Sequence, residues 1–449
     1  MLNCIWLALI LLAVLIGGFT GRIKEMTDGA VKSAETAVTL SIGLIGVMAL
    51  WLGMMRLAEK AGLVQSLARM LRPVLRRLFP DVPTDHPAMG SMVMNIAANM
   101  LGLNNAATPL GLRAMKDLES LNPIPGTATN AMCTFLAINT SSVQLIPITA
   151  VAVLAAAGST NPSAIIGTAF LATICSTAAG IVAVKALEKL RAFRLPSPGD
   201  EASIPPLAAD AKQTGNEERS SLAAETAPHP MPTWGWLILA LFGAAVVWFF
   251  FREAFPQLFG RTIPAEAATQ SALVRAVNAI SLLAIPFLIA FFPLYAALRR
   301  IPIYEEFVEG AKEGFNVGVR IIPYLVAMLV AIGMFRGAGG IEMLTLALKP
   351  VLDAVGFPGE LLPMALMRPL SGSGTLAIFA DLVKTHGPDH LLSRMGGTLF
   401  GSTETTFYVI AVYFGSVAVK RTRHAVPAGL IADAVGMVAS VIICRMVFG

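Results

Sequence analysis

Two short polar runs interrupt stretches that are otherwise apolar, and they hold the residues best suited to chemistry. The first run is Asn-Thr-Ser-Ser at 139–142, and the second is Ser-Thr-Glu-Thr-Thr at 402–406. A carboxylate inside an apolar segment is costly, so Glu404 is expected to have a function. It could pair with a cation, carry a coupling proton or accept hydrogen bonds from a polar substrate. A structural ion pair with an arginine, for which Arg368 is the candidate, is the alternative.

A second kind of polar cluster lies in segments too rich in Gly, Asn and Pro for a simple helix. Residues 95–108 contain four asparagines, and Arg368 opens a run of Pro, Ser, Gly and Thr that extends to residue 375. Broken backbone at membrane depth must find hydrogen-bond partners inside the protein, and Asn supplies both donors and acceptors. A helix break near Arg368 would also expose N–H groups that can hold an anionic or polar group. These residues either bind substrate or only satisfy the broken backbone.

From these clusters we predict a binding site for a small polar molecule. The candidate substrate-binding residues are Asn95, Asn99, Asn139, Ser141, Ser142, Arg368, Ser371, Ser373, Thr403, Glu404 and Thr405. Two acids within apolar stretches, Glu404 and Asp433, are candidates for binding a coupling ion.

The motifs of the common enzyme classes are missing from the sequence. It contains no GxSxG, no HExxH and no P-loop, and its four cysteines are widely separated with no CxxC pair. We therefore predict that the protein is not an enzyme, that it has no metal site and that it has no cofactor.

The elements that must position these residues are membrane-spanning helices. Of the 449 residues, 55% are hydrophobic and 14% are charged, whereas soluble domains carry about 25% charged residues. Two apolar segments, 128–157 and 396–419, are interrupted by the polar runs, and two others, 88–112 and 362–382, are too broken for a simple span. Uninterrupted apolar stretches of about 20 residues indicate spans, and they run near 2–19, 37–57, 163–187, 234–251, 271–298, 321–335 and 425–448. With the two interrupted segments, the expected number of crossings is about nine.

Basic residues indicate the orientation, because they favour the cytoplasmic side. A cytoplasmic N-terminus and nine crossings place the four basic groups, at 56–77, 191–194, 299–300 and 420–423, in the cytoplasm. Residues 62–79 and 303–319 have an apolar face and a charged face, so we predict that they lie in the membrane interface. Residues 2–19 lack a basic n-region and a clean cleavage site, and we interpret them as a retained span rather than a signal peptide.

The two halves of the chain show the same order of motifs, which indicates an internal repeat. Arg72-Pro-Val-Leu corresponds to Lys349-Pro-Val-Leu, and 134–142 corresponds to 398–406. If one element of each repeat is re-entrant, each repeat crosses three times, and two crossings separate the repeats. Odd repeats joined by an even connection must be inverted. The re-entrant element is either 88–112 or 128–157.

The predicted fold is an all-α polytopic membrane protein with two inverted repeats, re-entrant hairpins and broken helices. Its expected segments are an N-terminal span (1–28), the first repeat (29–194), a cytoplasmic linker rich in Pro, Ala and acidic residues (195–232), two connecting spans (233–302) and the second repeat (303–449).

Longer stretches resemble a known family. In the first half, MNIAANMLGLNNAATPLGLRAMKDL and NTSSVQLIP resemble spore maturation protein A. In the second half, EEFVEGAKEGFNVGVRIIPYLVAMLVAIGMFR, MRPLSGSGT and GSTETTFYVIAVYFG resemble spore maturation protein B, so the chain looks like a fusion of the two. Both carry the nucleoside-recognition or gate domain, which is similar to parts of concentrative nucleoside transporters and of the ferrous iron permease. The GSTET run at 401–405 is similar to a GQTE hairpin motif of the nucleoside carriers, with Ser402 in place of Gln.

The residues and the resemblance together predict a secondary transporter or exporter of a small polar metabolite, nucleoside-like or similar. The resemblance implies the bacterial cytoplasmic membrane as its location and an elevator-like movement. One alternative is a non-transporting scaffold or sensor in envelope or spore maturation. Another is a divalent-cation permease, for which Glu404 and Cys133 are the obvious ligands. The expected partners are a small-molecule substrate and membrane lipid, with no nucleic acid, and a homodimer is one assembly considered.

Overall fold

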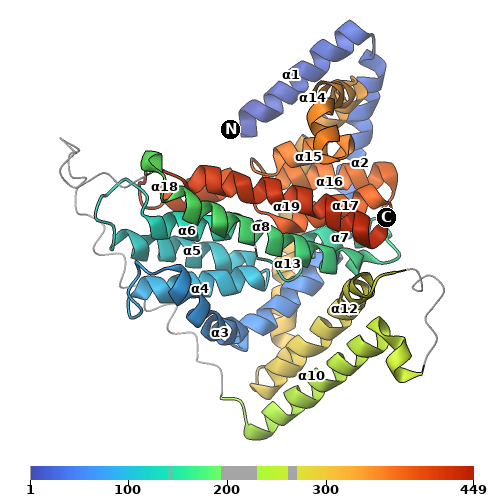
Figure 1. The fold of residues 1–449 in the computed structure, drawn as a ribbon. Coiled ribbons are helices and arrows are strands. Elements are labelled where there is room, and N and C mark those ends of the chain that lie inside the picture. Colours follow the sequence, from blue (N-terminus) through green and yellow to red (C-terminus); the bar gives the residue numbers. More distant parts are fainter. Residues whose placement is uncertain (1, 142, 194–229, 261–269) are drawn as a thin grey trace.

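The computed structural model describes residues 2–141, 143–193, 230–260 and 270–449, and most of these residues are helical (Figure 1). Over those ranges the chain forms no β-strand, only one isolated bridge between Thr127 and Arg421. The all-helical prediction is therefore confirmed. Ser142 and most of the predicted linker lie outside the described residues.

Among the described residues, seven consecutive α-helices of the first half correspond in order to seven of the second half. The first half contains α2 (Ile23–Lys60), α3 (Leu63–Leu78), α4 (Pro87–Met100), α5 (Asn104–Glu119), α6 (Asn130–Thr140), α7 (Ile148–Ala156) and α8 (Ile165–Leu187). The second half contains α13 (Ile303–Gly337), α14 (Gly340–Val355), α15 (Leu362–Met367), α16 (Gly372–His386), α17 (Leu391–Ser402), α18 (Thr406–Gly415) and α19 (Ala425–Phe448). Helix α1 (Leu2–Thr20) precedes the first set, and α10 (Thr233–Ala254) and α12 (Ala272–Leu298) come between the sets.

Equivalent helices of the two halves pack against each other in opposite directions. A side-chain carbon on Gly29, near the start of α2, would meet the carbonyl of Gly333 near the end of α13. One on Gly53, near the end of α2, would meet the ring of Phe307 near the start of α13. The pair α8 and α19 also lies side by side across the centre of the molecule (Figure 1). This antiparallel pairing of equivalent helices is what inverted repeats require.

Six helices within the described residues are long and apolar enough to cross a membrane. They are α2, α8 with the 3-10 turn before it (Pro162–Leu187), α10, α12, α13 and α19. These six contain six of the seven uninterrupted stretches predicted from the sequence. The seventh stretch, 2–19, forms α1, whose apolar part (Trp6–Thr20) is shorter. The count of nine crossings stays a prediction.

Residues 303–319 do not form a separate interfacial helix, so that prediction was wrong. They continue into the span as α13, whose 35 residues extend about 50 Å, against about 30 Å of bilayer hydrocarbon. Gly310 and Gly314 lie against the backbone of α2, where a side-chain carbon would clash. This close approach gives the first half of α13 a helical partner, and the helix therefore continues without a break.

Helix α3 does form over the residues predicted to lie in the membrane interface. One side of it, at Val64 and Leu75, is buried in the protein core. Another side leaves Met70 74% exposed and Val74 61% exposed. An exposed apolar side next to a row of arginines is typical of a helix in the plane of the membrane.

Candidate functional site at two helix breaks

The two segments considered as re-entrant elements fold differently. Residues 88–112 turn back on themselves as a helical hairpin, in which Ser91 on α4 donates a 2.5 Å hydrogen bond to Asp117 on α5. Residues 128–157 instead form two short helices, α6 and α7, with a break between them. The first repeat therefore contains both a hairpin and a discontinuous helix.

The first break lies between Thr140, the last residue of α6, and Ile148, the first of α7. The hydroxyls of Thr140 and Ser141 donate to carbonyls of the last turn of α6, at 3.1 and 2.9 Å. These bonds satisfy acceptors that a continuing helix would have used. Pro147 precedes α7 and has no N–H with which to continue a helix. The sequence itself thus ends α6 and starts α7.

The second break is shorter. Helix α17 ends at Ser402 and α18 begins at Thr406, so three residues separate them. The first break begins inside the segment 134–142 and the second lies wholly inside 398–406, and these are the segments that the sequence repeat aligns. The discontinuous helix predicted from the second polar run is therefore confirmed.

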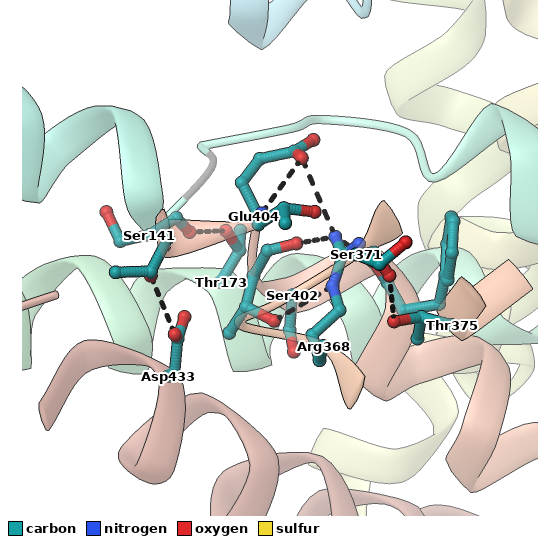
Figure 2. A network of polar contacts seen from close by, with 12 residues as sticks. Ser141, Thr173, Arg368, Ser371, Thr375, Ser402, Glu404 and Asp433 are labelled. Atoms are coloured by element: carbon teal, nitrogen blue, oxygen red, sulfur yellow. Dashed lines mark hydrogen bonds and ion pairs between the residues drawn. The ribbon is translucent and has the colours of Figure 1, made fainter. Parts of the chain in front are cut away.

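The two breaks bind each other. The backbone N–H of Glu404 donates to the carbonyl of Thr140 at 2.8 Å, and Figure 2 shows the residues of the two breaks facing one another. Close by, Gly401 lies against the ring of Pro147, with no room for a side chain. Polar backbone atoms exposed by one interruption are thus partly satisfied by the other.

A network of amide and hydroxyl groups connects the hairpin to both discontinuous helices. Asn99 donates to Asn139 at 2.8 Å, and the Tyr413 hydroxyl of α18 donates to the same oxygen at 3.4 Å. Asn95 donates to the Ala107 carbonyl at 2.7 Å and to the Tyr413 hydroxyl at 3.3 Å. The three predicted asparagines are therefore brought together, although their hydrogen bonds are mainly to one another and to the backbone.

Arg368 holds the second break in place. Its side chain is 3% exposed and donates to the carbonyl of Thr403, to the Thr403 hydroxyl at 3.3 Å and to the carbonyl of Phe400 at 2.9 Å. The guanidinium also lies over the Phe400 ring, 4.6 Å from its centroid. The Glu404 carboxylate is 3.9 Å from the guanidinium, which is a longer contact. Arg368 therefore binds mainly the backbone of the break.

Glu404 is the charged side chain at the breaks that a ligand can reach. Its side chain is 35% exposed, whereas Arg368 and Asp433 are buried. Among the described residues, the partners of its carboxylate are the N–H of Thr405 at 3.3 Å and Arg368. The alternative of a structural ion pair thus accounts for only part of the environment of Glu404.

Ser371 and Ser373 lie at the start of α16, beside the second break. The Ser371 hydroxyl accepts from the N–H of Gly374 at 3.0 Å and lies 3.3 Å from the Ser373 hydroxyl. A side-chain carbon on Gly372 would lie 3.1 Å from the hydroxyl of Thr405. The helix start is capped by its own residue, so one N–H group predicted to be free for a ligand is already used.

Asp433, in α19, contacts the residue that directly follows the second break. Its carboxylate accepts a 2.6 Å hydrogen bond from the Thr406 hydroxyl, at the first residue of α18. The other carboxylate oxygen is buried and has no hydrogen-bond partner among the described residues. Asp433 is therefore a second, buried acid beside the second break (Figure 2).

Sequence reasoning missed Tyr413 and Thr173. The Thr173 hydroxyl of α8 donates to the carbonyl of Ser141 at 3.1 Å, which stabilises the first break. A tyrosine in an apolar helix needs a partner for its hydroxyl, and this was the signal available for Tyr413. Tyr408 on the same helix carries the same signal, yet it is exposed. Predicted site residue Ser142 lies outside the described residues.

The residues considered for a divalent-cation site are not brought together. Cys133 is buried with its sulfur 3.7 Å from the carbonyl of Thr422, near the start of α6. Glu404 meets the other end of α6, at Thr140, which is about 10 Å further along the helix. Over the part of the chain that the structure describes, no three His, Cys, Asp or Glu side chains gather as metal ligands.

Comparisons with known proteins match both halves of the chain. The gate family, described as nucleoside recognition, matches residues 41–160 and 318–420, which include both breaks. Spore maturation protein B of Bacillus subtilis (strain 168) is 46% identical over 173 residues, which are 38% of this chain and 97% of that protein. Spore maturation protein A of the same organism is 43% identical over 182 residues, 40% of this chain and 93% of that protein. No solved structure matches the chain.

Proposed function

This chain belongs to the family of the spore maturation proteins A and B, and from that premise we propose that it is a secondary transporter of a small polar metabolite. The observation that carries the proposal is the hydrogen bond between the two helix breaks, from Glu404 to Thr140. Discontinuous helices contributed by inverted repeats are a common way in which secondary transporters build a substrate site near the middle of the bilayer. The bacterial cytoplasmic membrane is the proposed location, with the N-terminus in the cytoplasm.

The proposed substrate site has a neutral side and a charged side. Asn139 and its amide partners supply hydrogen-bond donors and acceptors on the side of the first break. Glu404 supplies an acceptor on the side of the second break, and Arg368 fixes the backbone that carries it. Such a set suits a neutral ligand with several hydroxyl or amide groups. The nucleoside recognition described for the matching family supports a nucleoside-like substrate class.

Glu404 and Asp433 are the proposed sites of the coupling ion. Both are acids at the second break, and the free oxygen of Asp433 has no hydrogen-bond partner among the described residues. A carboxyl group in such a place can carry a proton, since a buried carboxylate is costly unless its charge is compensated. We propose that the ion binds at the start of α18, where the Thr406 hydroxyl donates a hydrogen bond to Asp433.

The first test is ligand binding by the purified, full-length protein in detergent. Its thermal stability would be measured with a panel of nucleosides, amino acids, dicarboxylates and metal ions. A ligand at about a hundred times its dissociation constant should stabilise the fold by roughly 2.7 kcal/mol. The variant Glu404→Gln should lose the effect of that ligand. Glu342→Gln, which changes an exposed acid on α14, is the matched control and should retain it.

Two outcomes would contradict the proposal. One is a panel in which no compound stabilises the wild-type protein. The other is a ligand that stabilises wild type and Glu404→Gln equally, since the ligand would then bind away from the second break. A scaffold or sensor would also bind a ligand at this site, so movement of the ligand across a sealed membrane separates the two functions.

A further inference from the structure

A pocket of about 460 Å³ opens beside the first turn of α12. It lies at the start of α17, whereas the helix breaks lie at the end of that helix. Its polar lining includes Asn161, Glu253, Gln270, Arg275, Asn278 and Arg394. None of these residues takes part in the site described above. The pocket therefore needs an explanation of its own.

The protein holds the two arginines of the pocket in place but does not use all of their hydrogen-bond donors. Arg275 donates to the carbonyl of Ala254 at 3.3 Å through Nε and to the carbonyl of Gln270 at 3.0 Å through one terminal nitrogen. Arg394 lies 3.7 Å from Asp389, and its buried Nε has no hydrogen-bond partner among the described residues. A buried donor without a partner is costly, so the protein does not fully satisfy Arg394.

The charge of the pocket favours an anion. Among the described residues Glu253 is the one acid that lines the pocket, and its carboxylate is 3.1 Å from a terminal nitrogen of Arg252. Within the part of the chain that the structure describes, Arg275 forms no ion pair, and the charge of Arg394 is offset only by Asp389, 3.7 Å away and outside the pocket lining. Arginine offers a planar fork of N–H donors that matches the oxygens of a phosphate group. A phosphate is accordingly the anion that this lining fits.

The pocket continues onto an exposed apolar stripe of α12. Leu282 lines the pocket and is 52% exposed, and Ile289 is 38% exposed. Arg275, Asn278, Leu282 and Ile289 follow one another at helical spacing along the same side of α12. Because α12 is one of the helices able to cross a membrane, this stripe runs from the pocket toward the hydrocarbon. An occupant with a phosphate at one end and an apolar chain at the other fits both parts.

We infer that the pocket binds the phosphodiester headgroup of an anionic phospholipid, with an acyl chain along the α12 stripe. The headgroup phosphate accepts hydrogen bonds from Arg275 and Arg394, and Asn278 supplies a further polar contact. Basic pockets between transmembrane helices are a known physical basis for lipid recognition. The apolar stripe favours a lipid over free phosphate, which shares only the headgroup chemistry.

The test is lipid binding to the delipidated, full-length protein, measured by native mass spectrometry. The probes are phosphatidylglycerol, phosphatidylcholine and inorganic phosphate. Wild type should bind phosphatidylglycerol at least about tenfold more tightly than phosphatidylcholine, and the double variant Arg275→Gln/Arg394→Gln should lose that preference. Arg445→Gln removes an exposed cation in the last turn of α19, outside the pocket, and should bind like wild type.

Variants that keep the charge guard against misfolding of the double variant. Arg275→Lys and Arg394→Lys should fold, as judged by size-exclusion chromatography, and should bind phosphatidylglycerol with intermediate affinity, because Lys lacks the planar fork. Equal binding of phosphatidylglycerol by wild type and the double variant would overturn the inference. The inference would also be overturned if inorganic phosphate displaced bound lipid at the same concentration at which free phosphatidylglycerol displaces it. The acyl chain would then contribute nothing to binding.

Discussion

The two helix breaks share a backbone design and differ in charge. In the first break, the carbonyls and hydroxyls near Asn139 and Ser141 are satisfied by neutral groups, including Asn99 and Thr173. In the second break, the same task falls to a buried arginine, Arg368, with two acids close by. The repeat has kept the interrupted helix in both halves, but the ionisable chemistry lies in one half.

The same asymmetry recurs where the loops of the two repeats meet. The loop before α6 is joined to the loop before α19 by backbone bonds, such as Ala128 N–H to the Arg421 carbonyl at 3.0 Å. At the equivalent place, Asp389 accepts from the Ser159 hydroxyl at 2.6 Å and from the Thr160 N–H at 2.9 Å. Charge again comes from the second repeat. The first repeat therefore acts mainly as a neutral partner, which predicts unequal effects of matched mutations.

The largest effect is expected from Arg368→Leu. The change leaves the carbonyls of Thr403 and Phe400 buried without their donor, and it removes the cation nearest Glu404. We expect the free energy of unfolding to fall by about 3 to 5 kcal/mol. Thermal unfolding in detergent measures it, with the exposed Arg445→Leu as control. A loss below about 1 kcal/mol would mean that the second break does not depend on this charge.

A smaller loss of stability is expected from adding a side-chain carbon where the two breaks touch. Gly401→Ala adds a carbon where Gly401 lies against Pro147, and such overpacking costs about 1 to 3 kcal/mol. Gly90→Ala is the control, because nothing lies within 4 Å of a side-chain carbon there and alanine favours helix by about 0.5 to 1 kcal/mol. Thermal unfolding should thus move in opposite directions for the two variants. A stabilised Gly401→Ala protein would show that the breaks do not pack as described.

The smallest effect is expected from Asp389→Asn. Partial burial acts to raise the pKa of Asp389. Hydrogen bonds from Ser159 and Thr160 have the larger, opposite effect, and they lower the pKa from 3.8 to about 2. A lowered pKa contributes stability above pH of about 4, and that stability is lost as the pH falls toward 2. Since Asp389 is part-exposed, we expect a loss of about 1 kcal/mol at neutral pH and a flatter stability profile below pH 4. An unchanged acid profile in the variant would contradict this assignment.

The sequence predicted the repeat and the places where its helices break, because polar residues in an apolar run are a local signal. It did not predict that α13 is continuous, since an amphipathic stretch followed by an apolar one has the same pattern whether the helix stops or not. The decision comes from α2, whose backbone lies against Gly310 and Gly314. Nor did it find Tyr413, whose partner Asn139 is 274 residues away. Contacts of that range leave no mark on local periodicity.

The role of Arg368 was also predicted only in part. Its type and surroundings indicated a helix break and a partner for Glu404. The structure shows that its closest bonds are to the backbone of Thr403 and Phe400, which a sequence motif cannot specify. Charge type is readable from the sequence, whereas the division of an arginine's donors between backbone and carboxylate depends on packing.

The most direct test of the central claim is flux through the site at the two breaks. A ligand identified by thermal stabilisation would be offered to sealed proteoliposomes containing wild type, Glu404→Gln or the control Glu342→Gln. We expect the wild-type protein and the control to carry the ligand across the membrane, and Glu404→Gln to fall to the rate of empty vesicles. Binding without flux in the wild-type protein, or equal flux in Glu404→Gln, would contradict a transport site built around the second break.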